Sequence, residues 1–293
     1  MNAWIQQLLI PIARAPRQMQ EWSRERMAEG RSIGCVPTMG ALHEGHLSLI
    51  RKSASECDET IVTIFVNPLQ FGPAEDFVKY PRNEAQDVRM SRDAGAAIAY
   101  CPDVKTMYPD DRSAYVVEES LGKYLCGKSR PGHFRGVTTV VAKLLNACLP
   151  SRAYFGLKDY QQYLIIKRMV RDLDFPVEIV PCPIAREPDG LAMSSRNRYL
   201  SIIERRDALC LKMGLDGALE AFDFGERDAR AIERNAREMI ERAPSVRIDY
   251  VECRDAETLE DIESIDRPAV LALAVFIGAT RLIDDILLTP QEG

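Results

Sequence analysis

The sequence has little of several features that mark common protein classes. It contains only three histidines, and none of its eight cysteines forms a Cys-x-x-Cys pair. Scattered cysteines of this kind are typical of free thiols in a reducing compartment rather than of a disulfide framework. Basic residues number 38 against 44 acidic ones, which gives a net charge of −6. This acidic balance argues against nucleic-acid binding, which requires clustered Lys and Arg.

The chain also lacks an apolar run long enough to cross a membrane. At the N-terminus a short apolar stretch is soon followed by Pro11 and arginines, without a cleavage motif, so we expect no signal peptide. Elsewhere the longest run, residues 269–277, is far shorter than the ~20 residues that a bilayer requires. We therefore expect a cytoplasmic protein that does not bind membranes.

The first part of the chain alternates short β-rich runs with helical patterns. The predicted strands are 33–37, 60–66, 97–100, 153–155 and 177–180, and the predicted helices are 46–55, 83–94, 137–149 and 160–172. This alternation predicts an α/β domain over residues 1–185, with a doubly wound parallel sheet. Such sheets bind ligands beyond the carboxyl ends of their strands.

The pattern changes from about residue 186. Two long helical patterns come first, and three strand patterns follow them: helices 203–222 and 227–242, then strands 246–253, 269–276 and 281–287. Helices before strands predict a smaller α+β domain with an antiparallel sheet, over residues 186–293.

Two of the three histidines lie where the first predicted α/β strand meets its helix. His43-x-Gly45-His46 matches the HxGH signature of nucleotidyl-transferring α/β enzymes. Helix N-termini favour bound anions, and two imidazoles there can donate hydrogen bonds to phosphate oxygens. A metal site and a plain polar turn are the alternatives, although the spacing is not that of HExxH.

Other polar groups follow predicted strands or lie near the domain boundary. Ser194-Ser195-Arg196 can wrap a polyphosphate, and Lys158 can reach a phosphate beside Asp159, which can cap a helix or hold a ribose hydroxyl. Arg130 and His133 lie in a basic Gly/Pro-rich loop suited to an anionic substrate. For each of these segments, a solvated loop without a ligand is the alternative.

A long irregular segment, residues 67–82, follows the clearest strand and contains three prolines and a glycine. Loops of this length are usually functional or disordered, and its position favours function. Gln70 in this loop can offer both a donor and an acceptor to a hydroxylated substrate. The loop could also exclude water from an intermediate that hydrolyses readily.

Together these segments resemble the pantothenate synthetase (pantoate–β-alanine ligase) family. The resemblance rests on motifs in family order: PTMGALHEGH, FVNPLQFG, EDFVKYPR, RPGHFRGVTTVVAKL, FGLKDYQQ, REPDGLAMSSRNRYL and FIGATRLID. It implies that MgATP activates pantoate as an acyl-adenylate and that β-alanine then accepts the acyl group. It also implies a Rossmann-like first domain, a C-terminal lid and a homodimer.

The resemblance implies roles for individual residues. The residues that bind ATP would be Pro37, Thr38, Met39, His43, Gly45, His46, Gly156, Lys158, Asp159, Met193, Ser194, Ser195 and Arg196. Of these, the catalytic residues would be His43, His46, Lys158, Ser194, Ser195 and Arg196. Pantoate and β-alanine would contact Met39, Gln70, Gln162, Arg130 and His133. Asp87 would hold Mg²⁺ through water, although the stretch 83–87 has fewer acidic residues than in relatives. Ala185 stands where relatives more often have Val, a small change near the adenine.

Three other functions compete with this hypothesis. Another HxGH nucleotidylyltransferase would lack a β-alanine-dependent step and would need a more basic acceptor pocket than Gln70 and Gln162 suggest. A non-catalytic nucleotide-binding or scaffold protein could afford to lose His43, His46, Lys158 and Arg196, yet all four are present. An aminoacyl-tRNA synthetase is disfavoured because the chain is short and acidic.

Overall fold

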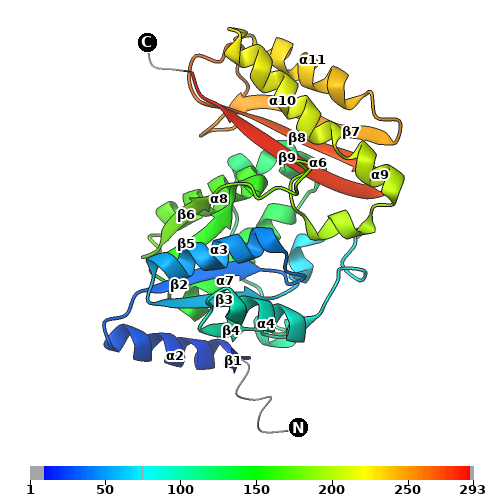
Figure 1. Cartoon of the computed structure of the whole chain (residues 1–293). Coiled ribbons are helices and arrows are strands. Elements are labelled where there is room, and N and C mark those ends of the chain that lie inside the picture. Colours follow the sequence, from blue (N-terminus) through cyan, green and yellow to red (C-terminus); the bar gives the residue numbers. More distant parts are fainter. Residues whose placement is uncertain (1–9, 74, 291–293) are drawn as a thin grey trace. The chain divides into compact units, whose positions relative to one another are not determined.

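The structure, a computed structural model, describes residues 10–73 and 75–290 and forms two compact units (Figure 1). The first unit comprises the chain up to residue 118 together with 130–157 and 165–183. The second comprises 119–129, 158–164 and the chain from 184 onward. The single boundary predicted after residue 185 leaves out the two internal segments of the second unit. Most of the N-terminal apolar stretch considered for a signal peptide lies outside the described residues.

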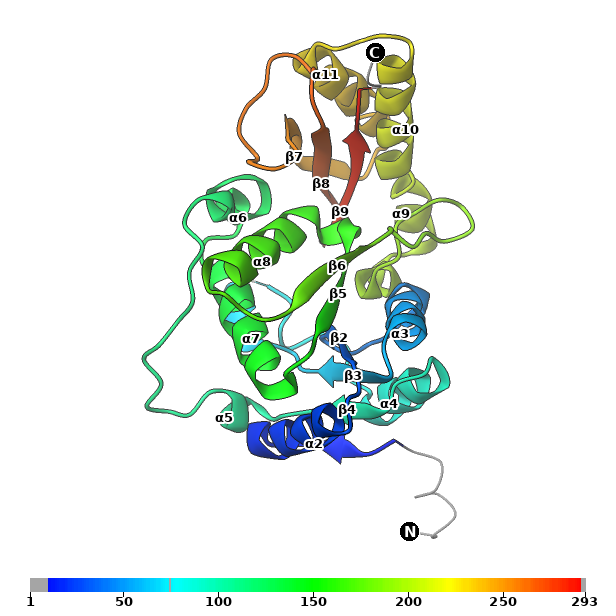
Figure 2. The ribbon, with the colours of Figure 1, turned by 90° about the vertical axis from the view of Figure 1, so that its left-hand side faces the viewer.

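A six-stranded parallel sheet forms the centre of the first unit, in the order β1-β4-β3-β2-β5-β6 (Figure 2). Its strands are β1 (Ile12–Ala13), β2 (Ile33–Thr38), β3 (Glu59–Ile64), β4 (Ile98–Tyr100), β5 (Arg152–Gly156) and β6 (Glu178–Cys182). From β2 the chain builds outward through β3 and β4, then returns to add β5 and β6 on the other side. The topological switch point therefore lies between β2 and β5, and sheets of this kind bind ligands at that point. The predicted α/β class is confirmed.

Helices cover both faces of this sheet, which explains why its central strands are buried along almost their whole length. Cys35 of β2 pairs with Ile61 of β3 on one side and with Ala153 of β5 on the other, and all three are fully buried. The helices α3 and α4 pack on one face, and α2 and α7 on the other (Figure 2). The helices of this unit are α2 (Pro16–Ala28), α3 (Glu44–Glu56), α4 (Glu84–Asp93), α5 (Val104–Met107) and α7 (His133–Cys148), with the 3₁₀ turn η1 (Pro68–Gln70).

The second unit is built on a three-stranded antiparallel sheet in the order β7-β8-β9, as predicted. Its core joins this sheet to α10 and α11. The strands are β7 (Val246–Asp255), β8 (Ala269–Ile277) and β9 (Thr280–Leu288). The helices are α6 (Leu125–Ser129), α9 (Ile202–Asp207), α10 (Cys210–Asp223) and α11 (Ala229–Ile240), with the 3₁₀ turns η2 (Leu121–Lys123), η3 (Leu157–Asp159) and η4 (Ser195–Tyr199), of which η3 begins in the first unit. The helix α8 (Tyr160–Asp172) begins in this unit and ends in the first.

The helix predicted over 203–222 is two helices, so that prediction was wrong in detail. Between α9 and α10 the amide of Leu209 bonds the Arg206 carbonyl, and that of Leu211 bonds the Ala208 carbonyl. Hydrogen bonds between residues i and i+3, as in a 3₁₀ helix, tighten the backbone here and end the first α-helix. Asp207 is held at this break by the Ser245 hydroxyl at 2.8 Å.

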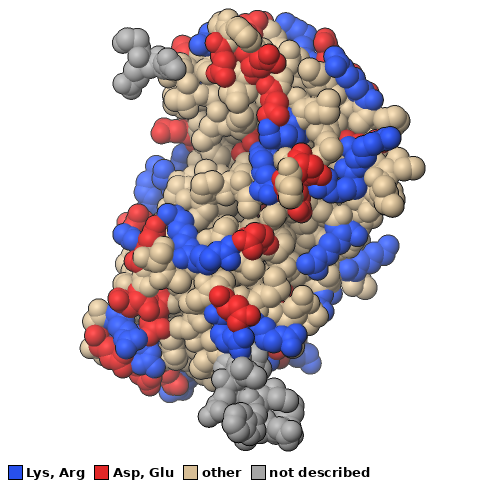
Figure 3. All heavy atoms as spheres, in the orientation of Figure 1, with Lys and Arg blue, Asp and Glu red and all other residues tan. Residues whose placement is uncertain are grey.

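None of the helices in the described ranges has both the length and the apolar character needed to span a bilayer. On the face drawn in Figure 3, basic and acidic side chains are interspersed. The net charge of −6 is thus the small difference between two large, mixed populations.

Gly136 lets helix α7 touch the backbone of η1. A Cβ at this position would lie 2.3 Å from the Leu69 carbonyl oxygen and 2.6 Å from the Gln70 nitrogen. The Gly136 carbonyl in turn accepts a hydrogen bond from the Asn67 side-chain amide at 3.0 Å. Since Gln70 belongs to η1, this contact fixes a residue that the sequence assigns to substrate binding.

We expect Gly136→Ala to lower the free energy of unfolding by about 2 kcal/mol, because the added methyl group must displace the η1 backbone. Urea unfolding followed by circular dichroism measures the change. Gly156→Ala is the matched control, since a Cβ there meets no atom within 4 Å. Equal losses for the two variants would contradict this account of Gly136.

Two adjacent aspartates of β9 lie buried in the second unit. Asp284 accepts hydrogen bonds from both terminal nitrogens of Arg186, at 2.7 and 3.0 Å, and its side chain is 0% exposed. Burial raises the pKa of the Asp285 carboxyl well above its ordinary value, and the nearby charges of Asp284 and Asp159 raise it further. Lys158 and Arg186 oppose this shift without cancelling it.

A carboxyl group whose pKa is raised by folding binds its proton more tightly in the folded state, so its cost to stability grows as the pH rises. We therefore expect Asp285→Asn to raise the thermal unfolding midpoint at pH 8 and to change it little below about pH 3, where the carboxyl is protonated in both the folded and the unfolded state.

Asp284→Asn is the control for this prediction. It should lower the midpoint at pH 8, because it takes the charged partner from the part-buried Arg186. A lower midpoint for Asp285→Asn at pH 8 would show that its carboxylate stabilises the fold.

Candidate active site

The turn between β2 and α3 holds the HxGH motif at the switch point of the sheet. β2 ends at Thr38, whose hydroxyl donates to the Thr63 carbonyl at 2.7 Å and accepts from the Gly40 amide at 3.2 Å. After Met39, two successive residues have left-handed backbone, with φ of 79° at Gly40 and 51° at Ala41. The chain thereby reverses within a few residues and enters α3 with His43 as its N-cap. The end of β2, this turn and the start of α3 together contain the predicted residues Pro37, Thr38, Met39, His43, Gly45 and His46.

The two histidines of the turn cap α3 and fix each other's orientation. The Nδ1 atom of His43 accepts a hydrogen bond from the Gly45 amide at 3.2 Å, and that of His46 accepts from the His43 amide at 3.3 Å. A neutral imidazole that accepts through Nδ1 carries its proton on Nε2. The pair, with ring centroids 4.1 Å apart, is therefore set to donate through both Nε2–H groups at the start of a helix, where anions are favoured.

Met39 and Gln70, which the sequence assigns to the same substrate, are neighbours in the first unit. The side-chain amide nitrogen of Gln70 lies 3.1 Å from the Met39 sulfur, and its oxygen accepts from Asn67 at 2.9 Å. Asn67 is itself buried, and its oxygen accepts from the Tyr108 hydroxyl at 2.8 Å. The Gln70 side chain is thus oriented by groups on other parts of the unit.

Arg130 and His133 hold the backbone of the long loop. Arg130 forms a two-bond ion pair with Glu75, at 2.7 and 2.6 Å, and also donates to the Gln70 carbonyl at 3.2 Å. Nδ1 of His133 lies 2.8 Å from the same carbonyl oxygen. Burial alone would raise the pKa of Glu75, but the hydrogen bonds and charge of Arg130 lower it overall. These two basic residues thus fix the carbonyl of Gln70.

The carboxylate of Asp87, on α4, accepts hydrogen bonds from the backbone of the HxGH turn. It is 3% exposed, and its two oxygens accept from the backbone amides of Ala41 at 3.0 Å and Leu42 at 2.9 Å. No group of three or more His, Cys, Asp or Glu side chains suited to a metal occurs in the described part of the chain.

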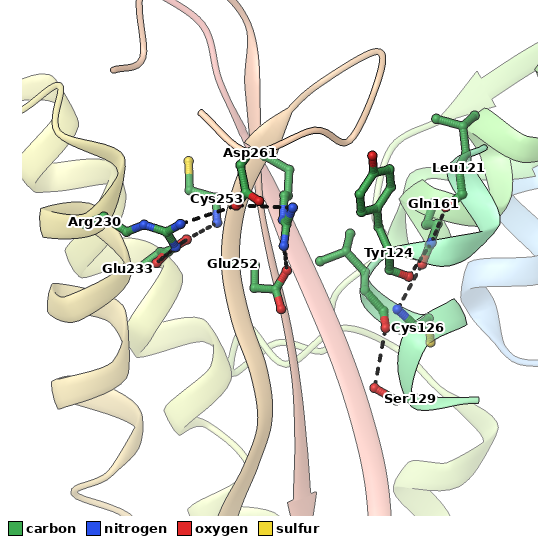
Figure 4. A network of polar contacts seen from close by, with 12 residues as sticks. Leu121, Tyr124, Cys126, Ser129, Gln161, Arg230, Glu233, Glu252, Cys253 and Asp261 are labelled. Atoms are coloured by element: carbon green, nitrogen blue, oxygen red, sulfur yellow. Dashed lines mark hydrogen bonds and ion pairs between the residues drawn. The ribbon is translucent and has the colours of Figure 1, made fainter. Parts of the chain in front are cut away.

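In the second unit, Lys158 and Asp159 lie on η3, and Gln162 lies in the first turn of α8. Tyr160 and Gln161, which lie between Asp159 and Gln162, anchor this part of the chain through their side chains. The Tyr160 hydroxyl donates to the Ala256 carbonyl at 2.8 Å. Gln161 donates to the carbonyls of Leu121 and Tyr124, both at 2.8 Å, and accepts from the Cys126 amide at 3.0 Å (Figure 4).

The segment 119–129 is fixed in turn by the sheet of the second unit. The guanidinium of Arg254, on β7, lies over the Tyr124 ring, 5.4 Å from its centre. The same guanidinium pairs with Glu252 and with Asp261. A continuous chain of polar contacts therefore leads from the sheet to the turn that carries Lys158 and Gln162.

The predicted polyphosphate loop begins with a short antiparallel turn in the second unit. The backbones of Arg186 and Ala192 form an isolated antiparallel β-bridge, and the Met193 amide donates to the Ala185 carbonyl at 2.9 Å. Ser194 then caps η4 by accepting from the Arg196 amide at 3.2 Å, and Ser195 is buried. Met193, Ser194, Ser195 and Arg196 are thus presented by one ordered turn.

Several residues that shape the site escaped the sequence analysis. Asn67 bonds Gln70 and Glu75 bonds Arg130, whereas Tyr108 acts through Asn67 and Gln161 holds the segment 119–129. Although three of the four lie within the family motifs, none of them was given a role of its own. Only Asn67 gave a local signal, since a residue that caps a turn often precedes proline. The partners of Glu75 and Gln161 lie 55 and 35 to 40 residues away, so they are set by tertiary structure.

Comparison with known proteins agrees with this geometry. The family model described as pantoate-beta-alanine ligase matches residues 11–287. The pantothenate synthetase of Moorella thermoacetica is 52% identical over 286 residues, which cover 98% of this chain and 100% of that protein. Among solved structures, a pantothenate synthetase from Thermus thermophilus superposes with a TM-score of 0.90 at 39% identity, covering 96% of this chain and 100% of that one.

A second solved structure is pantoate-beta-alanine ligase from Francisella tularensis, in complex with beta-gamma ATP and beta-alanine. It has a TM-score of 0.77 at 34% identity and covers 95% of this chain and 97% of that one. The match of the family model over nearly the whole chain, together with 52% identity to a relative matched along its full length, places the protein within a family. The chain belongs to the pantoate–β-alanine ligase family.

Proposed function

We propose that the protein condenses pantoate with β-alanine to give pantothenate, with ATP cleaved to AMP and pyrophosphate. The observation that carries this proposal is the histidine pair capping α3, whose Nε2–H groups are set to donate at the carboxyl end of β2. Donors preset in this way suit a reaction in which charge develops on phosphate oxygens. Family membership supplies the substrates, and the structure of a relative was solved in complex with beta-gamma ATP and beta-alanine.

In the first step a carboxylate oxygen of pantoate attacks the α-phosphorus of ATP. The bond from this phosphorus to the bridging oxygen of the β-phosphate breaks, and pyrophosphate leaves with that electron pair. His43 and His46 donate to the phosphate oxygens as charge shifts onto them. In the second step the β-alanine amine attacks the acyl carbon, the C–O bond to AMP breaks, and the nitrogen releases a proton.

For residues of the second unit, the family resemblance implies a cation and hydroxyl groups that bind ATP. Lys158 neutralises phosphate charge, and Asp159 contacts the nucleoside, as does Gly156 of the first unit. Ser194, Ser195 and Arg196 bind the polyphosphate, with Met193 beside them, in the lid role that the family resemblance implies. Catalysis then consists of positioning and electrostatic stabilisation, and it requires no nucleophilic side chain.

Pantoate is held in the first unit by Gln70 and Met39, and in the second by Gln162. The geometry of Arg130 and His133 supports an indirect part for both, because each contacts the Gln70 carbonyl. Mg²⁺ enters as part of the MgATP substrate. A homodimer in the cytoplasm, without nucleic-acid or membrane partners, remains the prediction from the sequence.

ATP–pyrophosphate exchange tests the proposed first step. With purified protein and Mg²⁺, we expect exchange with pantoate but not with a panel of other small hydroxy acids. Adding β-alanine should then release AMP in proportion to pantothenate. A folded, ATP-binding protein that gives no exchange with pantoate would contradict the assignment and leave an HxGH enzyme with another acceptor.

We expect His46→Ala and Lys158→Ala each to slow adenylate formation by about 10²–10³, the usual loss when one preset electrostatic donor is removed. Single-turnover formation of pantoyl-adenylate measures this effect. Lys52→Ala, on the exposed side of α3, and Lys212→Ala, on α10, are matched controls because both lysines pair with acidic surface residues. Rates within tenfold of the wild type would remove His46 and Lys158 from the mechanism.

A further inference from the structure

The amides that precede α3 form a small anion-binding concavity. Gly40 and Ala41 both have positive φ, and successive N–H groups in such turns point toward a common centre. Left-handed backbone is unfavourable for a residue with a side chain, so Ala41 with φ of 51° needs compensation from its surroundings. The Asp87 carboxylate supplies two hydrogen bonds at this place, to the amides of Ala41 and Leu42.

The chain is shaped to let this carboxylate approach. A Cβ on residue 40 would lie 2.9 Å from Oδ2 of Asp87, so glycine serves there both for its conformation and for its lack of a side chain. Asp87 itself lies in the first turn of α4, where the Ser91 hydroxyl donates to its carbonyl at 2.8 Å. The carboxylate thus sits on a rigid element and is 3% exposed.

This arrangement does not fit the magnesium role that the family resemblance implies for Asp87. Mg²⁺ in proteins keeps several water molecules, so a ligand that acts through water must face solvent or a wet cavity. The Asp87 carboxylate instead faces backbone N–H groups, which repel a cation. Within the described ranges, no set of three or more potential acidic, His or Cys ligands surrounds it.

We propose that Asp87 is a positioning residue that clamps the HxGH turn, rather than a residue that holds Mg²⁺. Leu42 directly precedes the N-cap His43, and the His43 amide donates to the His46 ring. The direction of the Leu42 peptide therefore determines where both imidazoles point. What these imidazoles bind rests on the proposed function, whereas their orientation by Asp87 does not.

Asp87→Asn tests the clamp with little change in volume. The Asn side chain has an oxygen that accepts hydrogen bonds and a nitrogen that only donates them. One of the two backbone N–H groups therefore loses its hydrogen bond and faces another donor. Long-range ¹H–¹⁵N spectra of the untagged protein, without metal or nucleotide, report which ring nitrogen of each histidine is protonated. The chain has only three histidines, so His133 serves as an internal reference.

We expect the signals of His43 and His46 to move in Asp87→Asn while those of His133 stay in place. Pantoate-dependent exchange at saturating ATP and Mg²⁺ should fall by about tenfold to a hundredfold, as for other misplaced catalytic groups. The Mg²⁺ concentration for half-maximal exchange should not change. Asp93→Asn, on the exposed side of α4, is the matched control and should leave all of these readouts unchanged.

Two results would overturn the proposal. One is wild-type histidine signals in Asp87→Asn. The other is a tenfold higher Mg²⁺ requirement with full activity restored at high Mg²⁺, as expected for a metal-binding role. Wild-type protein without exchange activity would instead count against the proposed function and leave the histidine readout valid.

A measurement on the unmodified protein covers the case in which Asp87→Asn does not fold. Millimolar Mg²⁺, added without nucleotide, should leave the amide resonances of Ala41 and Leu42 in place, because the carboxylate remains bound to them. A selective shift of these two resonances with Mg²⁺ would overturn the proposal.

Discussion

The hydrogen bonds from the amides of Ala41 and Leu42 to the Asp87 carboxylate tie the turn between β2 and α3 to the first turn of α4. A strand that ends at the switch point of a parallel sheet offers only its carboxyl end to a ligand, so the following turn decides which groups are presented. This turn presents two imidazoles through their Nε2–H groups. A buried charge is costly unless it is hydrogen-bonded. The buried carboxylate of Asp87 meets this condition by accepting hydrogen bonds from the turn that it fixes.

The second unit orients its polar groups by the same principle. Gln161 and Tyr160 use their side chains to fix backbone and leave the adjacent Lys158, Asp159 and Gln162 for other roles. In the first unit, Arg130 and His133 fix the carbonyl of Gln70 in a comparable way. In both units, residues that hold backbone alternate along the chain with residues that are proposed to meet substrate.

The sequence predicts the central strands because β2 and β3 are rich in β-branched and apolar residues, and it predicts the start of α3 from an HxGH motif after a strand. It could not predict β1, which is two residues long, or the break between α9 and α10, which depends on backbone bonds rather than on composition. The role of Asp87 was equally hidden, since its partners lie 45 and 46 residues away. A carboxylate near a nucleotide motif suggests a metal, and only its burial and its two amide partners indicate otherwise.

The central claim is that the histidines of the turn before α3 stabilise the attack of a carboxylate on the α-phosphorus of ATP. Pantoate labelled with ¹⁸O in its carboxyl group tests this claim most directly, since the attacking oxygen stays with the phosphorus when the acyl group moves to β-alanine. We expect one ¹⁸O atom in the phosphate of AMP for each pantothenate formed, and none in pyrophosphate. Label in inorganic phosphate, with ADP as the other product, would show attack at the γ-phosphorus and contradict the account.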